Sequence, residues 1–133
     1  ADPHEADLDL AEMLLVAARS DHVQACRLLK QHGVDINEAW KLNARRYWTN
    51  STTIDTAESL LRIGCDPNTK VRNGGTALHR LAEVVGGLWS AEHENICVQM
   101  LRLGADASAE DDRGRKPIDN DRIAALWKSF NER

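Results

Sequence analysis

The 133-residue chain lacks several features that would assign it to a class of protein at once. Its three cysteines include no close pair, which is a poor basis for a disulfide framework and favours a reducing compartment. Positive charge is not in excess, because the formal net charge is −4, and nucleic-acid binding usually needs a basic surface. No apolar run approaches the roughly 20 residues of a membrane helix, and the acidic first residues lack a signal-peptide core. We therefore expect an intracellular protein, cytoplasmic or nuclear, with neither nucleic-acid binding nor membrane insertion.

The clearest feature present is a segment that occurs three times. Each copy is an apolar helical run closed by glycine, followed by a small residue, Asp, a spacer, and Asn or Ser. The copies are Leu28–Asn37, Leu60–Asn68 and Met100–Ser108. Their glycines, Gly33, Gly64 and Gly104, lie 31 and 40 positions apart, on either side of a period near 33 residues. Glycine accepts the left-handed backbone that ends a helix, and Asp and Asn favour a turn, so each copy predicts a helix, a sharp stop and a turn.

The other half of the repeating unit resembles a known family. Asn73–Ala82, with the sequence N-G-G-T-A-L-H-R-L-A, resembles the ankyrin-repeat pattern D-x-G-x-T-P-L-H-x-A-A, and Asp112–Asp119 is a more divergent copy. Leu14–Val23 resembles the L-x-x-A-A-x-x-G-H-V stretch that joins the two helices of a repeat. The resemblance spans roughly residues 10 to 120. It implies an all-α solenoid of stacked helix-turn-helix units with short hairpin loops, in one domain, 1–133, with repeats at about 6–35, 36–67, 68–107 and 108–133.

Two of the units depart from the family pattern. The third is seven residues longer than the pattern, near 84–91, and the second is two residues short and has W-K-L-N-A-R-R-Y-W at 40–48 where T-P-L-H would stand. We expect the first helix of the second unit to be irregular or displaced. The predicted helices are 8–19, 22–31, 40–47, 53–62, 77–84, 93–102 and a closing helix at 120–130.

The cysteines and histidines are candidates for chemistry, but the repeat gives them structural roles. Cys26 and Cys97 each precede their repeat glycine by seven positions, on the buried helix face, and Cys65 stands where its sister repeats have Val and Ala. His93 begins an H-E-x-x-C segment, which lacks the second histidine of the zinc motif H-E-x-x-H. By the resemblance, His79 joins adjacent hairpins through hydrogen bonds.

Other catalytic and ligand motifs are missing. Gly74-Gly75 is the expected hairpin turn and Gly86-Gly87 lies in the insertion, and neither begins a phosphate-binding loop. The acidic run 110–112 lacks the spacing of a calcium loop and is expected at a hairpin tip. We therefore expect no metal, no cofactor and no enzymatic activity.

The four tryptophans are the residues that the repeat explains least. Trp127 is expected to pack the closing helix against the third repeat. Trp40 and Trp48 lie where the pattern has no large aromatic, so they are either core filler or exposed anchors for a partner. Trp89 lies inside the insertion, which favours a binding role because an insertion has little core to fill.

The resemblance implies that hairpin tips and first helices form a concave surface that binds partner proteins. The tips are expected near 39–40, 72–74 and 111–113, and the first-helix contributions near 45–48 and 80–83. Arg45 and Arg46 are donors of the type that captures carboxylates. The candidate binding residues are Trp40, Arg45, Arg46, Tyr47, Trp48, Arg72, Asn73, Arg80, Trp89, Asp111, Asp112 and Arg113. The basic middle and the acidic last tip favour a partner with the opposite charge order.

The expected function is thus that of a monomer that binds another protein. One alternative is a substrate-recognition or inhibitory module of a larger regulatory assembly, such as a ubiquitin-ligase adaptor or a signalling or kinase inhibitor. A remote alternative is a small-molecule-binding or enzymatic domain with a pocket under the insertion.

Overall fold

The computed structural model describes residues 3–46, 48–49, 51–84 and 86–132, with side chains from Leu10 onward. Within these ranges the chain forms helices and no strand, which confirms the prediction of an all-α protein. The elements are α1 (Pro3–Arg19), α2 (Val23–Gln31), α3 (Ile36–Ala44), α4 (Ser51–Ile63), α5 (Ala77–Ala82), the 3-10 helix η1 (Gly86–Leu88), α6 (Ala91–Arg102), the 3-10 helix η2 (Pro117–Asp119) and α7 (Asp121–Asn131).

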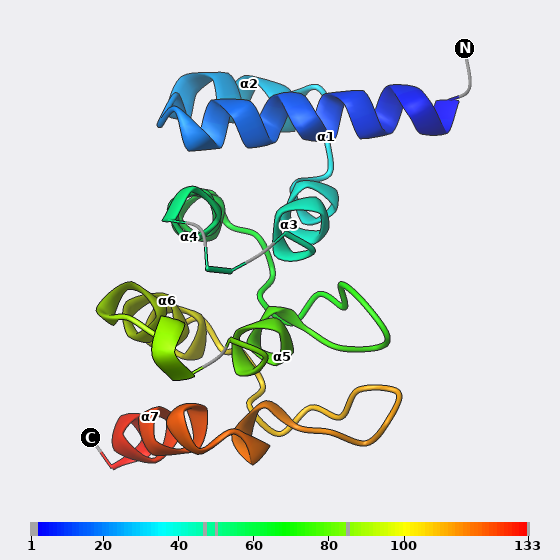
Figure 1. Cartoon of the computed structure of the whole chain (residues 1–133). Coiled ribbons are helices and arrows are strands. Elements are labelled where there is room, and N and C mark those ends of the chain that lie inside the picture. The colour runs from blue at the N-terminus through cyan, green and yellow to red at the C-terminus, as the bar shows by residue number, and fades with distance from the viewer. Residues whose placement is uncertain (1–2, 47, 50, 85, 133) are drawn as a thin grey trace.

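The helices form pairs, and the pairs stack in one column (Figure 1). The contacting pairs are α1 with α2, α3 with α4, α5 with α6, and η2 with α7. Along the column α1 lies on α3 and α4, α4 lies on α6, and α6 lies on α7. Two loops, 66–76 and 105–116, project from the same side of the column (Figure 1).

Three of the helices end in the same hydrogen-bonded geometry. Gly33, Gly64 and Gly104 have φ angles of 91°, 114° and 93°, in the left-handed region that favours glycine. In each case the glycine N–H donates to the carbonyl three residues before it, and the next N–H donates to the carbonyl five residues before itself. This is the Schellman arrangement, which satisfies carbonyls that a helix end leaves free. The predicted helix stops are confirmed at all three glycines.

The core runs the length of the column, between the paired helices. Its members come from every α-helix whose side chains are described, and each large aliphatic side chain contributes about 1.5–3 kcal/mol by leaving water. The largest fully buried apolar side chains are Leu14, Leu15, Trp40, Leu60, Leu78, Leu81, Ile96, Met100 and Ile123. The prediction that Trp127 packs the closing helix is wrong, because Ile123 fills that place while Trp127 remains 40% exposed.

The first helix of the second unit is displaced, as expected, but it is regular. It was predicted at 40–47 and instead spans Ile36–Ala44, because the Asp35 carboxylate accepts a hydrogen bond from the Asn37 N–H and caps the helix immediately after the preceding turn. No residues are left for a hairpin, so the predicted tip at 39–40 is wrong: both residues lie inside α3 with no exposed surface. The other predicted helices are confirmed to within five residues at their starts and two at their ends.

Asparagine side chains connect the turns of successive units. Asn37 Oδ1 accepts a hydrogen bond from the Asp66 N–H at 2.9 Å. One unit further along, Asn68 Oδ1 accepts from the Asp106 N–H at 2.7 Å, and Asn68 Nδ2 donates to the Gly104 carbonyl at 2.9 Å. These bonds fix the register of one turn against the next.

Candidate binding surface at the hairpin tips

The two projecting loops close into tight turns. In the first, Val71 and Gly75 bond at 2.7 Å, and the Gly75 N–H donates to the Arg72 carbonyl at 2.7 Å. Asn73 and Gly74 between them both have positive φ, at 50° and 72°, as a type I′ turn requires, and Asn-Gly is the preferred pair for it. Arg72 and Asn73 are exposed on this tip, as predicted.

The second tip is organised by an acidic side chain. Asp111 Oδ1 accepts from the backbone N–H groups of Arg113 and Arg115 at 3.0 and 2.9 Å, and Oδ2 accepts from the Arg115 guanidinium at 2.9 Å. Desolvation alone would raise the pKa of this carboxyl, but the donated hydrogen bonds and the Arg115 charge lower it below its ordinary value. Asp111 was predicted to contact a partner, but its carboxylate is almost fully covered and bonds within its own loop.

The tips are joined to each other and to α5. The Asp112 N–H donates to the Asn73 carbonyl at 2.9 Å, so one tip lies directly against the next. The Thr76 N–H donates to His79 Nδ1 at 3.0 Å, which leaves the proton on Nε2, and Nε2 donates to the Arg115 carbonyl at 2.9 Å. The predicted role of His79 in joining adjacent hairpins is confirmed.

Two shallow grooves lie beside α5: the first between α5 and both tips, and the second between α5, the second tip and η2. Their volumes are about 270 Å³ and 290 Å³, and both are lined by His79, Glu83, Asp111 and Arg115. Five of the predicted binding residues line the first groove: Arg72, Asn73, Arg80, Asp111 and Arg113. Asp112 is exposed beside it on the second tip.

The charges of the groove do not cancel. Glu83 pairs with Arg80 at 2.6 Å and Asp111 pairs with Arg115 at 2.9 Å, which uses both acids of the first groove. Arg72 and Arg113 are exposed and form no side-chain hydrogen bond or ion pair within the described part of the chain. The groove therefore presents two unneutralised guanidinium groups.

The three other predicted arginines have partners within the fold. Arg80 Nε donates to the Ala44 carbonyl at 3.2 Å and Nη2 to the Arg45 carbonyl at 3.3 Å, so this cation caps the C-terminal end of α3. Arg45 Nε donates to the Val71 carbonyl at 2.9 Å. Arg46 forms an exposed ion pair with Glu12 at 3.3 Å. Arg80 and Arg45 thus attach the second unit to the third.

The tryptophans of the second unit fill the core. Trp40 has no exposed surface and Trp48 exposes only 3%, so both are core filler, and the prediction that they bind a partner is wrong. The Trp48 indole N–H donates to the Ala44 carbonyl at 3.0 Å. Tyr47 lies outside the described residues.

Trp89 is not the exposed anchor that its place in the insertion suggested. Its ring stacks on His93, with centroids 5.3 Å apart, and Arg122 from α7 lies over it at 5.7 Å. Its indole nitrogen is buried. Trp89 therefore packs against the core, between His93 of α6 and Arg122 of α7.

Sequence reasoning placed Glu83 at the surface, within 80–83, but missed four other charged or polar residues that line one or both grooves. They are Arg115, Lys116, Asp119 and Asn120. The repeat pattern contained a signal for Arg115. This residue lies in 112–119, the divergent copy of the segment 73–82, and 73–82 contains the groove residue His79. The pattern contained none for Asn120, which follows that copy.

The described ranges contain no metal-binding cluster, no disulfide and no helix suited to span a membrane. No three His, Cys, Asp or Glu side chains among them are grouped so that they could hold a metal ion. Cys26, Cys65 and Cys97 are buried and unpaired with one another, as predicted. No helix in the described part of the chain is both long and apolar enough to span a bilayer.

Comparison with known proteins gives no family assignment. The chain matches no protein-family model, and no curated protein matches it.

Proposed function

We propose that the chain is an ankyrin-type repeat protein whose grooves at the two hairpin tips bind an acidic segment of a partner protein. The fold supports this proposal with helix pairs in one column, three equivalent glycine stops and two tips on one side. The His79 hydrogen bonds support it too, because they have the role that the resemblance gives to this histidine.

The observation that carries the proposal is the unpaired state of Arg72 and Arg113. They come from neighbouring tips that are joined by the Asp112–Asn73 backbone bond, so both guanidinium groups border one groove. Arginine is enriched among the residues that dominate binding energy, and its planar donors fit a carboxylate with two parallel bonds. A partner segment with two carboxylates would neutralise both.

The structure changes the expected charge of the partner. The sequence predicted an acidic last tip, but the Asp111 carboxylate accepts hydrogen bonds from its own turn and is not free for a partner. Both tips then present an arginine, with Asp112 exposed beside them, and the favoured partner places its carboxylates opposite Arg72 and Arg113. Charges of this kind raise the association rate and set the register of the bound segment.

A peptide-display selection tests the proposal. A random 12-residue library would be selected on the wild-type protein and on Arg72→Glu/Arg113→Glu, with Arg102→Glu/Lys128→Glu as the control. The control removes two exposed cations from α6 and α7, outside the grooves, and therefore changes the net charge equally.

We expect Asp- and Glu-rich peptides from the wild type and the control, with affinity for the tip variant lowered about tenfold or more. Thermal melts would show that both variants fold. Selected peptides that are not acidic, or that bind the tip variant as well as the control, would overturn the proposal.

A further inference from the structure

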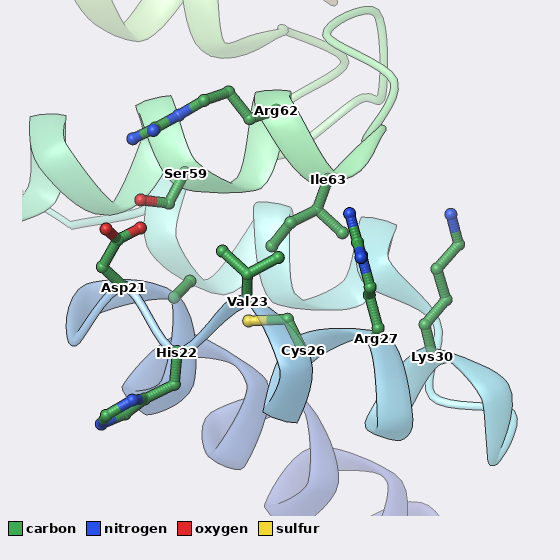
Figure 2. A pocket seen from close by; sticks show the side chains of 10 residues that line it. Asp21, His22, Val23, Cys26, Arg27, Lys30, Ser59, Arg62 and Ile63 are labelled. Atoms are coloured by element: carbon green, nitrogen blue, oxygen red, sulfur yellow. The ribbon is translucent and has the colours of Figure 1, made fainter.

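A larger groove lies on another part of the column, between α2 and α4. Its volume is about 390 Å³, and its walls come from the α1–α2 turn, α2 and the C-terminal half of α4 (Figure 2). In Figure 1 these helices lie away from the side from which the two hairpin loops project. The hairpin grooves share no lining residue with it.

The middle of this groove is apolar. Cys26 is fully buried at its base, Ile63 is half-buried in its α4 wall, and Val23 leaves 43% of its surface exposed between them. Figure 2 shows Val23 at the centre with its methyl groups directed toward α4. An aliphatic side chain entering here would remove apolar surface from water on both walls.

Cations surround this apolar surface, and they lack partners. Arg27, Lys30 and Arg62 line the groove and are exposed, and none of them forms an ion pair or side-chain hydrogen bond within the described residues. Arg27 and Lys30 are three positions apart on α2, so they project from one face of it, and Figure 2 shows both extending toward the end of α4. The chain carries a net charge of −4, so this is a positive region on an acidic protein.

An acidic residue marks the opposite end of the groove. Asp21 has a φ of 57°, in the left-handed region, at the position where the family pattern L-x-x-A-A-x-x-G-H-V has glycine. Its carboxylate points into the space beside Ser59 and forms no ion pair or side-chain hydrogen bond with the described residues (Figure 2). Figure 2 shows the Arg62 side chain extending toward this same end, above Ser59. The groove thus has one acid and one cation near the start of α2, and two cations without a nearby acid near its end.

We propose that the α2–α4 groove is a second protein-docking site, which binds a partner segment that carries an aliphatic side chain followed by carboxylates. The aliphatic side chain contacts Val23, Cys26 and Ile63. The carboxylates bind Arg27 and Lys30. This site is independent of the hairpin tips, so a partner could engage either one alone.

Charge complementarity and size select this occupant. A basic segment would bring like charges together at Arg27 and Lys30, which lowers affinity. A purely acidic segment would leave the apolar middle in water. The volume lies at the lower end of the range for binding pockets and suits one or two side chains rather than a whole helix.

Four short peptides on the wild-type protein test the proposal without any change to its fold. They are blocked at both ends and have the sequences S-L-E-E-S, S-L-Q-Q-S, S-L-K-K-S and S-S-E-E-S. Binding would be followed by ¹H–¹⁵N NMR at millimolar peptide, through the amide shifts of Val23, Cys26 and Ile63. We expect S-L-E-E-S to bind about five- to tenfold more tightly than each of the other three.

A charge-reversed variant gives the reciprocal test. In Arg27→Glu/Lys30→Glu we expect the preference to invert, so that S-L-K-K-S binds more tightly than S-L-E-E-S. Arg102→Glu/Lys128→Glu is the matched control, because it makes the same change in net charge at two exposed cations of α6 and α7, outside the groove, and should keep the wild-type preference.

Three results would overturn the inference. One is the absence of shifts at the three groove amides with S-L-E-E-S on the wild type. The second is equal binding of the glutamate and glutamine peptides, and the third is a control variant that loses as much affinity as the groove variant. None of these results bears on Arg72 and Arg113, so the hairpin proposal stands or fails separately.

Discussion

His93 and Trp48 are 45 positions apart in the chain, and the His93 Nε2 lies 2.6 Å from the Trp48 carbonyl oxygen. The Ser90 N–H donates to the other ring nitrogen, Nδ1, at 3.0 Å, so the proton is on Nε2 and is donated to Trp48. The Trp48 indole donates in turn to the Ala44 carbonyl at 3.0 Å. One histidine therefore caps the start of α6 and attaches the chain after α3 to it.

Replacing His93 tests this attachment. We expect His93→Ala to lower the free energy of unfolding by about 2–4 kcal/mol, because it removes a helix cap and leaves a buried carbonyl without its donor. Asn95→Ala, an exposed position on the same helix, should change it by no more than about 0.5 kcal/mol. Urea unfolding measures both, and equal effects would show that the hydrogen bond contributes little.

Substitutions at Trp40 test whether this side chain fills the core. Trp40→Ala should cost about 3–5 kcal/mol of stability, as large-to-small changes in a core do. Trp40→Phe should cost much less, because the indole N–H that it removes is buried without an acceptor among the described residues. If Trp40→Ala unfolded at the wild-type urea concentration, the ring would not be core filler.

The Asp106 and Asp111 carboxyls should make stability depend on acidity. The Ser108 hydroxyl and N–H lower the pKa of Asp106, and for Asp111 the donated bonds at the tip outweigh desolvation, so both pKa values lie below 3.8 in the folded chain. The unfolded chain then binds protons more readily, so the stabilisation is present above about pH 4 and is lost as pH falls through the folded values.

Urea unfolding at a series of pH values measures this loss. Asp106→Asn/Asp111→Asn should be less stable than the wild type at pH 6, and its stability should fall less between about pH 4 and 2. Parallel curves for the two proteins would show that the turns do not favour the ionised carboxyls.

The buried thiols should react slowly. Burial is the main cause that raises the pKa of Cys65 and of Cys97 from 9.0 to about 12, which leaves about a thousandfold less thiolate at neutral pH. Burial also raises the pKa of Cys26. With an aromatic disulfide reagent, we expect little reaction in the native protein and three reacting thiols in denaturant. Rapid reaction of Cys65 or Cys97 in the native state would contradict the packing described above.

Asp21 should lower the stability of the folded chain relative to glycine at the same position, because its φ is positive. A left-handed backbone costs an L-residue about 1–2 kcal/mol, whereas glycine adds about 0.5–1 kcal/mol of unfolded-state entropy. Asp21→Gly should therefore raise the free energy of unfolding by up to about 1 kcal/mol, measured in urea against the wild type. A loss of stability would mean that the carboxylate contributes more to the fold than its backbone costs.

Much of the fold could be predicted from local sequence, because its strongest signals are local. A left-handed residue after a helix is nearly always glycine, so Gly33, Gly64 and Gly104 marked three helix ends correctly. The Asn73-Gly74 pair likewise specified its turn by its own backbone preference.

The first helix of the second unit was predicted less well, although its own residues indicate where it begins. Ile36, Ala39, Trp40 and Ala44 follow helical spacing, and Asp35 before them is a preferred cap, so a helix at 36–44 was present in the sequence. The family pattern has a hairpin tip at this point of the repeat, and this chain has a helix in its place.

Partners distant in the chain could not be predicted from residue type. Arg80 looked like a binding arginine, and only the folded chain brings its guanidinium to the Ala44 and Arg45 carbonyls, 36 and 35 positions away. The same holds for the groove between α2 and α4, whose walls come from separate units.

The asparagine hydrogen bonds between turns divide the loops of the molecule into two kinds. The turns that these bonds join have a fixed length, whereas the connections within a helix pair can change in length. Asn37 and Asn68 set the rise from one unit to the next at the turns after α2 and α4. Segment 84–91 lies elsewhere, between α5 and α6, so residues added there leave that rise unchanged. Evolution could therefore lengthen the connections within a helix pair and so vary the outline of the protein. A single residue inserted between Gly64 and Asn68 would instead change the register of every later unit relative to the first two.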